Sequence, residues 1–253
     1  MKILAVETAT SWQSVALLDG ARVLALSHEE AGGAHARKLL PAIDRLLLES
    51  GLSLATLDGL AVSIGPGSFT GLRVGLATMM GFRMITGLPL ASVPTLEALA
   101  WNFRLADRLL CPILRARTGA VYWAMYRWTT DGRLTQIIGE QVGSMEALAQ
   151  SITGPTIVLG EGWLAYGDEL RRLLGPDARE VVEAPQEAMR ASAVSVGLAG
   201  LERLARQDLA PLGLSPRYVQ RPEAELKEIH GLTRPKVAPQ SHVAGSGRGQ
   251  GST

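Results

Sequence analysis

Apolar and polar positions along the chain predict two successive regions with the same order of strands and helices. In the first region short apolar runs predict strands, Asp19-Gly20 predicts a hairpin turn, and a leucine stripe with helical spacing predicts a helix interrupted or delayed by Pro41. The strands are expected at residues 3–7, 14–18, 22–27, 60–64 and 88–92, and the helices at residues 34–50 and 72–86. This βββαβαβ order is typical of a mixed sheet flanked by helices.

The second region repeats the pattern and predicts a duplicated α/β unit with a cleft between its halves. Its strands are expected at residues 113–115, 121–128, 134–141 and 156–159, and its helices at residues 145–151, 164–174 and 190–206. We therefore expect one domain over residues 1–100 and a second over residues 101–225. Residues 226–253 are rich in Pro, Gly, Ser, Gln and Arg without periodicity, which predicts a disordered tail.

A glycine-rich loop at residues 65–73, Gly-Pro-Gly-Ser-Phe-Thr-Gly-Leu-Arg, joins a strand to a helix. Such a loop leaves backbone N–H groups at the positive end of the helix dipole, where anions bind. The loop matches neither the Walker A pattern nor the G-x-G-x-x-G order of dinucleotide sites. It therefore indicates close approach by a ligand or a chain segment, without identifying which.

Gly67, Gly71 and Gly75 recur every four residues, which places them on one helix face. Each interior glycine costs a helix ~1 kcal/mol relative to alanine, so the spacing needs a packing reason. Two interpretations are open. The helix lies tightly on its own sheet, or the bare ridge docks on another subunit.

Composition argues against several classes of function. A net charge of +1 gives no broad electrostatic footprint for nucleic acid or for a membrane surface. No apolar run reaches the ~18 residues of a membrane span. The single cysteine, Cys111, fits a reducing cytoplasm, and no two of the four histidines have the helical spacing of a metal pair.

Several segments together narrow the fold and family. Residues 3–10, Ile-Leu-Ala-Val-Glu-Thr-Ala-Thr, resemble the first phosphate loop of the actin, sugar-kinase and Hsp70 (ASKHA) superfamily. The further segments are residues 35–41, the loop at 65–73, residues 87–90, residues 96–99 and Ser-Pro-Arg-Tyr-Val-Gln-Arg-Pro at 215–222. With them the chain resembles the bacterial TsaB (YeaZ) family over about residues 1–225. The resemblance implies a two-domain, actin-like α/β fold with mixed sheets.

The resemblance also implies a role in making N6-threonylcarbamoyladenosine (t6A) at position 37 of tRNA. In that pathway a synthase makes threonylcarbamoyl-adenylate from threonine, bicarbonate and ATP, and the metal-bearing paralogue TsaD transfers the group to tRNA. A TsaB protein binds TsaD as a heterodimer, and the small ATPase TsaE joins them in a ternary complex. We expect a cytoplasmic scaffold that meets tRNA only through the complex, forms a homodimer when alone and needs no cofactor, beyond weak nucleotide binding in the complex.

One local comparison with TsaD predicts that this chain is not itself an enzyme. TsaD carries a His-x-x-x-His metal pair just after the strand that follows the glycine-loop helix. The matching positions here hold Thr95 and Leu99. Leucine cannot coordinate a metal, and threonine is a poor neutral ligand. We therefore expect no metal site and no catalytic residue.

Two sets of residues are expected to carry the function. The surface for TsaD or for a second copy is expected to contain His35, Leu39, Ile43, Gly71, Leu72, Arg73, Gly75, Leu76 and Met79. A remnant phosphate loop is expected to contain Glu7, Thr8, Thr10, Gly65, Gly67 and Ser68. Glu7 replaces the family's usual Asp, and Arg115 replaces an acid of its Asp-Ala-Arg motif, so roles for those two acids are in doubt.

Other functions remain as alternatives. The main one is an ATP-dependent kinase or ATPase of the ASKHA superfamily, which needs a catalytic Asp, yet Asp58 and Asp107 lie in no recognisable motif. An endopeptidase has no supporting motif. A direct tRNA binder is disfavoured by the near-neutral charge.

Overall fold

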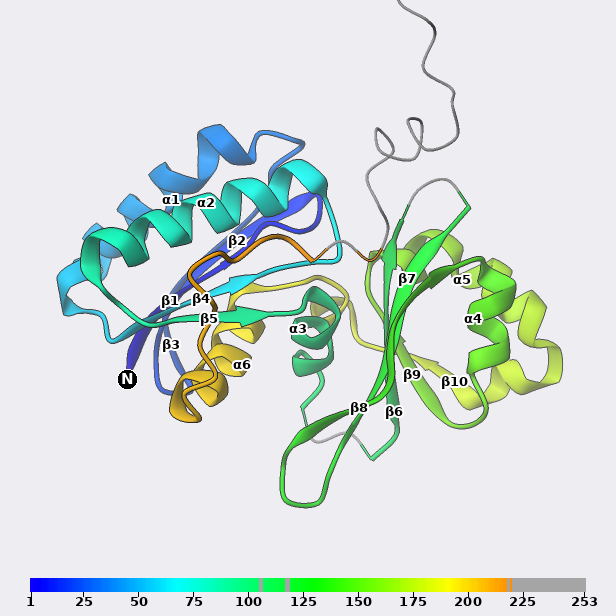
Figure 1. The fold of residues 1–253 in the computed structure, drawn as a ribbon. Helices are drawn as coiled ribbons and strands as arrows, with labels where there is room; N and C mark the ends of the chain where they lie inside the picture. The colour runs from blue at the N-terminus through cyan, green and yellow to red at the C-terminus, as the bar shows by residue number, and fades with distance from the viewer. Residues whose placement is uncertain (105–106, 117–118, 218, 220–253) are drawn as a thin grey trace, which may run out of the picture. The chain divides into compact units, whose positions relative to one another are not determined.

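The first half of the fold is built on a five-stranded mixed sheet. The computed structural model describes residues 1–104, 107–116, 119–217 and 219, and residues 1–220 form one compact unit (Figure 1). In the sheet order β3-β2-β1-β4-β5, β1 is antiparallel to β2 and parallel to β4. The strands are β1 (Lys2–Glu7), β2 (Trp12–Asp19), β3 (Arg22–Glu30), β4 (Gly59–Ser63) and β5 (Leu90–Val93).

Helices cover both faces of this sheet, because its central strands are apolar on both sides. In β1, Leu4 and Val6 join the core beneath α1 (His35–Glu49) and α2 (Phe69–Thr86). The alternate residues Ile3 and Ala5 join the core on the opposite face, beneath α6 (Ala193–Ala205). Figure 1 shows α1 and α2 side by side over the sheet.

The second half repeats this topology strand by strand. Its sheet has the order β8-β7-β6-β9-β10, with β6 antiparallel to β7 and parallel to β9. The strands are β6 (Leu109–Arg115), β7 (Val121–Trp128), β8 (Leu134–Gly143), β9 (Thr156–Leu159) and β10 (Val181–Glu183). The remaining helices are α3 (Thr95–Trp101), α4 (Met145–Ser151) and α5 (Glu161–Leu174), with short 3-10 turns at Leu54–Thr56, Gly175–Glu180 and Gln186–Ala188. The duplicated α/β fold with mixed sheets is confirmed.

Some boundaries differ from the sequence prediction for local reasons. The α2 helix starts at Phe69 rather than residue 72, because the Ser68 hydroxyl accepts a hydrogen bond from Gly71 N and caps it. The α1 helix starts at His35 and continues through Pro41. The α3 helix and the three-residue β10 were not predicted.

The domain boundary near residue 100 stays a prediction. The α6 helix belongs to the second predicted domain by sequence, yet it packs on the first sheet, where Gly200 lies against Ala61 and Gly197 against Leu18. The tail predicted over residues 226–253 lies outside the described residues. Within the described part of the chain, no helix is both long and apolar enough to cross a membrane.

Candidate functional site

The glycine ridge of α2 packs against the loop that follows β1. A Cβ atom at Gly67 would overlap the carbonyl oxygen of Ala9, and one at Gly71 would overlap that of Thr8. At Gly75 the same atom would meet the Thr8 hydroxyl. The ridge therefore makes room for the backbone of its own domain. In this structure the glycine ridge is covered by the loop after β1, so it is neither open to a partner nor packed on the sheet itself.

Oxygen atoms of the chain itself occupy N–H donors of the glycine loop and of the start of α2. Ser68 N donates to Ala9 O at 2.6 Å, and Gly71 N donates to the Ser68 hydroxyl at 3.2 Å. Gly65 N donates to the Thr95 hydroxyl at 3.1 Å. A phosphate group needs such N–H groups for itself. The chain's own oxygens therefore satisfy much of the predicted anion site.

Glu7 lies at the end of β1 and is completely buried. Its Oε1 accepts a hydrogen bond from Ala9 N at 2.5 Å, and Oε2 has no hydrogen-bond partner among the described residues. Burial raises the pKa of Glu7 to about 7, although Ser63 and Ala9 N–H oppose the shift. Near neutral pH this carboxyl group therefore exists partly in its neutral form.

The raised pKa of Glu7 predicts how stability changes with pH. The unfolded chain releases this proton near pH 4.5 and the folded chain near pH 7, so stability from this group is fully present below pH 4.5 and is lost as the pH rises through 7. The Glu7→Gln variant should remove this decline, which amounts to about 3 kcal/mol. Urea unfolding at several pH values tests it, with Glu49→Gln on the exposed end of α1 as the matched control. Parallel pH profiles of wild type and Glu7→Gln would contradict the assignment.

Thr95 and Leu99, at the positions where TsaD carries its metal-binding histidines, have structural roles here. Thr95 is buried and its hydroxyl holds Gly65, while Leu99 is buried in the core. Among the residues that the structure describes, no group of three or more His, Cys, Asp or Glu side chains could hold a metal ion. The buried His35 Nε2 lies 3.2 Å from Thr10 O, so its ring supports the β1–β2 loop.

A cleft of about 330 Å³ opens where the two halves meet. The first half contributes Thr10 and Trp12, and the second contributes Arg115 and Glu161. Burial raises the pKa of Glu161, and the neighbouring Arg115 opposes the rise. The Arg190 guanidinium carbon lies 4.0 Å from the centre of the Trp12 ring, and both residues line the cleft. Of these residues the sequence singled out only Thr10 and Arg115, although the glycines flanking Glu161 mark a strand-to-helix turn.

The predicted partner-binding residues have a different environment from the one expected. All of them except Arg73 are buried within the chain: His35, Leu39, Ile43, Gly71, Leu72, Gly75, Leu76 and Met79. These residues form the inner faces of α1 and α2, and they cannot reach a partner in this conformation. The residues of the predicted phosphate loop do come together, with Glu7, Thr8 and Thr10 buried and Ser68 exposed.

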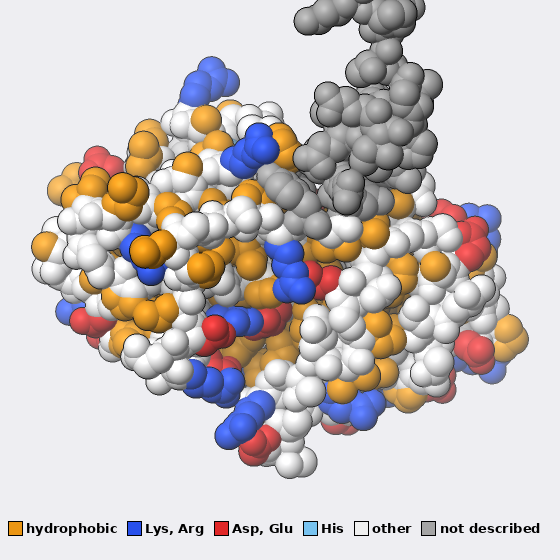
Figure 2. All heavy atoms as spheres, viewed as in Figure 1, with side chains coloured by type: hydrophobic (Ala, Val, Ile, Leu, Met, Phe, Trp, Pro, Cys, Tyr) orange, Lys and Arg blue, Asp and Glu red, His pale blue; other side chains and the backbone are white. Residues whose placement is uncertain are grey.

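The outer side of α2 is apolar and exposed. Met84 and Ile85 are 84% and 83% exposed, and the Arg73 guanidinium lies 3.6 Å from the centre of the Phe69 ring. Figure 2 shows hydrophobic side chains gathered at the end of the first half where α1 and α2 finish, and Leu48 of α1 is 78% exposed. Apolar surface of this kind marks interaction sites.

Comparison with known proteins relates the chain to proteins of tRNA modification. A family model described as TsaD, tRNA N6-adenosine threonylcarbamoyltransferase, matches residues 27–161. The chain is 37% identical over 174 residues to the tRNA threonylcarbamoyladenosine biosynthesis protein TsaB of Escherichia coli K12, covering 66% of this chain and 74% of that protein. It is 30% identical over 249 residues to the protein of the same name from Haemophilus influenzae, covering 91% of this chain and 98% of that protein.

Solved structures agree. The structure of YeaZ from Pseudomonas aeruginosa superimposes with a TM-score of 0.73 at 27% identity, covering 86% of this chain and 99% of that one. Component A of (R)-2-hydroxyglutaryl-CoA dehydratase from Acidaminococcus fermentans, at 10% identity and a TM-score of 0.50, shares the fold alone, covering 81% of this chain and 99% of that one.

Proposed function

Because the chain belongs to the TsaB (YeaZ) family, within the wider group that the TsaD model describes, we propose that it is a non-catalytic subunit required for t6A formation in tRNA. The observation that carries the non-catalytic part is the packing of Thr8 and Ala9 onto the glycine ridge. N–H groups at the start of α2 that bind the chain's own oxygens are not free to hold a phosphate group.

The proposed partner is TsaD, and the proposed docking face is the outer side of α2, defined by Phe69, Arg73, Met84 and Ile85. Near the start of α2 an arginine stacks on Phe69, and at its end Met84 and Ile85 are exposed; arginine and exposed apolar side chains are typical of an interface core. This docking face replaces the glycine ridge, which supports it from inside the domain.

The remaining partners follow from the same proposal. A second copy of the chain would pair through the same docking face, so the homodimer and the TsaD heterodimer would compete. TsaE would join the heterodimer, tRNA would be reached only through the assembly, and the complex would work in the cytoplasm. Binding of a nucleotide by this chain would be weak.

Depleting the protein from its cell tests the proposal. The t6A content of tRNA, measured by mass spectrometry of nucleosides, should fall and should recover when the wild-type chain is supplied. Unchanged t6A after full depletion would exclude the proposed role. Substantial ATP turnover by the isolated chain would favour the kinase or ATPase alternative instead.

A further inference from the structure

The chain after α6 forms a strap along the first half, defined here as residues 206–217. Ala210 N donates to Leu90 O of β5 at 2.8 Å, and Arg217 N donates to Ile64 O just after β4 at 2.7 Å. At Ala210 the carbonyl oxygen also accepts a hydrogen bond from Arg83 of α2 at 2.7 Å. Figure 1 shows this orange segment returning along β5 and β4 toward the second sheet. Its backbone is therefore attached to the first half at several points.

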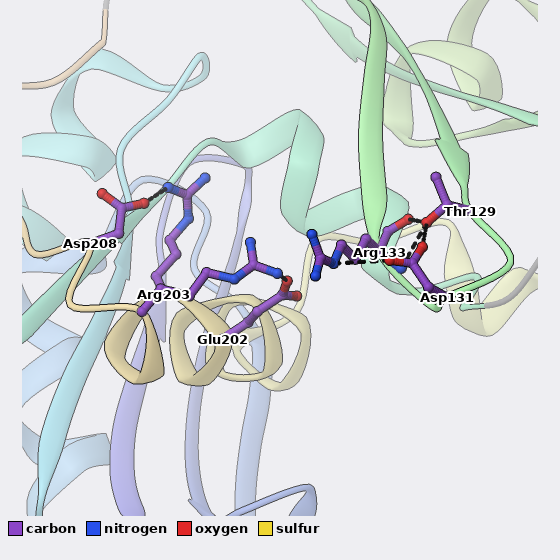
Figure 3. Close-up of polar contacts among 7 residues, drawn as sticks. Thr129, Asp131, Arg133, Glu202, Arg203 and Asp208 are labelled. Carbon is purple, nitrogen blue, oxygen red and sulfur yellow. Dashed lines mark hydrogen bonds and ion pairs between the residues drawn. The ribbon is translucent and has the colours of Figure 1, made fainter.

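The two ends of the strap carry ion pairs. At the start, Arg203 of α6 pairs with Asp208 at 2.6 Å (Figure 3). It also pairs with Glu97 of α3 at 2.7 Å. At the far end, Arg217 Nε lies 2.8 Å from Glu140 Oε2. Figure 2 shows charged side chains of both signs in the hollow between the two sheets.

Arg217 joins parts of the molecule that come from different halves. Its backbone lies on the first half, where its carbonyl oxygen would be 2.7 Å from a Cβ atom at Gly65, at the start of the glycine loop. Its partner Glu140 belongs to β8 of the second sheet, and that side chain is only 3% exposed. Burial raises the pKa of Glu140, and Arg217 opposes the rise. A buried carboxylate that loses its cation is strongly unfavourable, so this contact resists separation.

We infer that the strap is a clasp between the two halves, and that the Arg217–Glu140 pair is the contact that closes it. The halves are also joined by the chain crossings that follow α3 and precede α6, and by an apolar core that contains residues of both sheets. Chain crossings of this kind allow hinge motion. The Arg217–Glu140 ion pair links the segment beside β4 and the glycine loop to β8, and it restricts that motion. It thereby fixes the width of the cleft lined by Thr10 and Glu161. The clasp does not depend on the proposed function.

Distances between spin labels in the full chain test the clasp. Labels go on cysteines introduced at Glu49 of α1 and Gln150 of α4, both exposed, since Cys111 is buried. We expect a narrow distance distribution in the wild type, and a broader one with a longer mean in Arg217→Gln. The Arg133→Gln variant breaks the exposed pair with Asp131 inside the second half (Figure 3), and it should match the wild type.

Glu140→Gln provides the second test, because it removes the pair without leaving a buried charge. It should broaden the distribution even if Arg217→Gln fails to fold, and exchanging the two charges in Arg217→Glu with Glu140→Arg should narrow it again. A wild-type distribution in folded Glu140→Gln would overturn the clasp.

Discussion

Replacing Gly71 with alanine is expected to destabilise the protein by about 3 kcal/mol, although alanine is the better helix former. The new Cβ atom would overlap the carbonyl oxygen of Thr8, which is backbone and cannot rotate away. Relief requires α2 or the β1–β2 loop to move, and that movement strains the hydrogen bond from Ser68 N to Ala9 O. The effect therefore comes from packing and not from helix propensity.

The same helix offers a matched control. Gly81 has no atom within 4 Å of the position of its missing Cβ, so Gly81→Ala should stabilise the protein by about 0.5–1 kcal/mol. Urea unfolding followed by circular dichroism measures both variants. Equal effects of the two substitutions would mean that the ridge does not pack on Thr8, and the docking ridge would again be a valid interpretation.

Met84→Asp is expected to weaken binding to TsaD by about tenfold or more, while the fold stays intact. The side chain is 84% exposed in the free chain, so an aspartate there costs the monomer little. In a complex the carboxylate would be buried among apolar groups without a partner, which is costly. Calorimetric titration of the purified chain with TsaD gives the dissociation constant directly.

The control for this loss is Ile137→Asp. Ile137 is an apolar residue on β8 that is 52% exposed and lies outside the docking face. It should leave the affinity for TsaD unchanged. Loss of binding in both variants would point to a nonspecific effect of added charge. Full binding by Met84→Asp would remove the docking face from the proposal.

Much of the fold could be predicted because periodicity and turn residues are local signals. The strand, glycine loop and helix at residues 60–86 were visible from an apolar run followed by glycines. The duplicated topology followed from the repeated order of elements. The α3 helix and the β10 strand were not predicted, although α4, which has the same length as α3, was predicted from its sequence.

The direction of the glycine ridge could not be predicted, since spacing of four says which residues share a face and not what that face meets. Glycines on a helix face allow close approach either by a carbonyl group of the chain's own loop or by the backbone of another subunit. The structure distinguishes them because Thr8 lies against Gly71 and Gly75. A larger side chain at Gly75 is therefore expected to cost stability, because its Cβ atom would meet the Thr8 hydroxyl.

The cleft and the clasp depend on residues far apart in the chain. Trp12 meets Arg190, and Glu140 meets Arg217, across sequence separations that no local pattern reports. Ser-Pro-Arg at residues 215–217 was noticeable only as part of a family resemblance. The structure places Arg217 of this segment between Ile64, just after β4, and Glu140 of β8.

Rescue of t6A in depleted cells by two variants tests most directly whether this chain acts by docking or by chemistry. Glu7→Gln alters the carboxylate of the remnant phosphate loop, and Met84→Asp alters the docking face. We predict that Glu7→Gln restores t6A to the wild-type level and that Met84→Asp, expressed at equal abundance, does not. Full rescue by Met84→Asp together with failure of a folded Glu7→Gln would contradict the account.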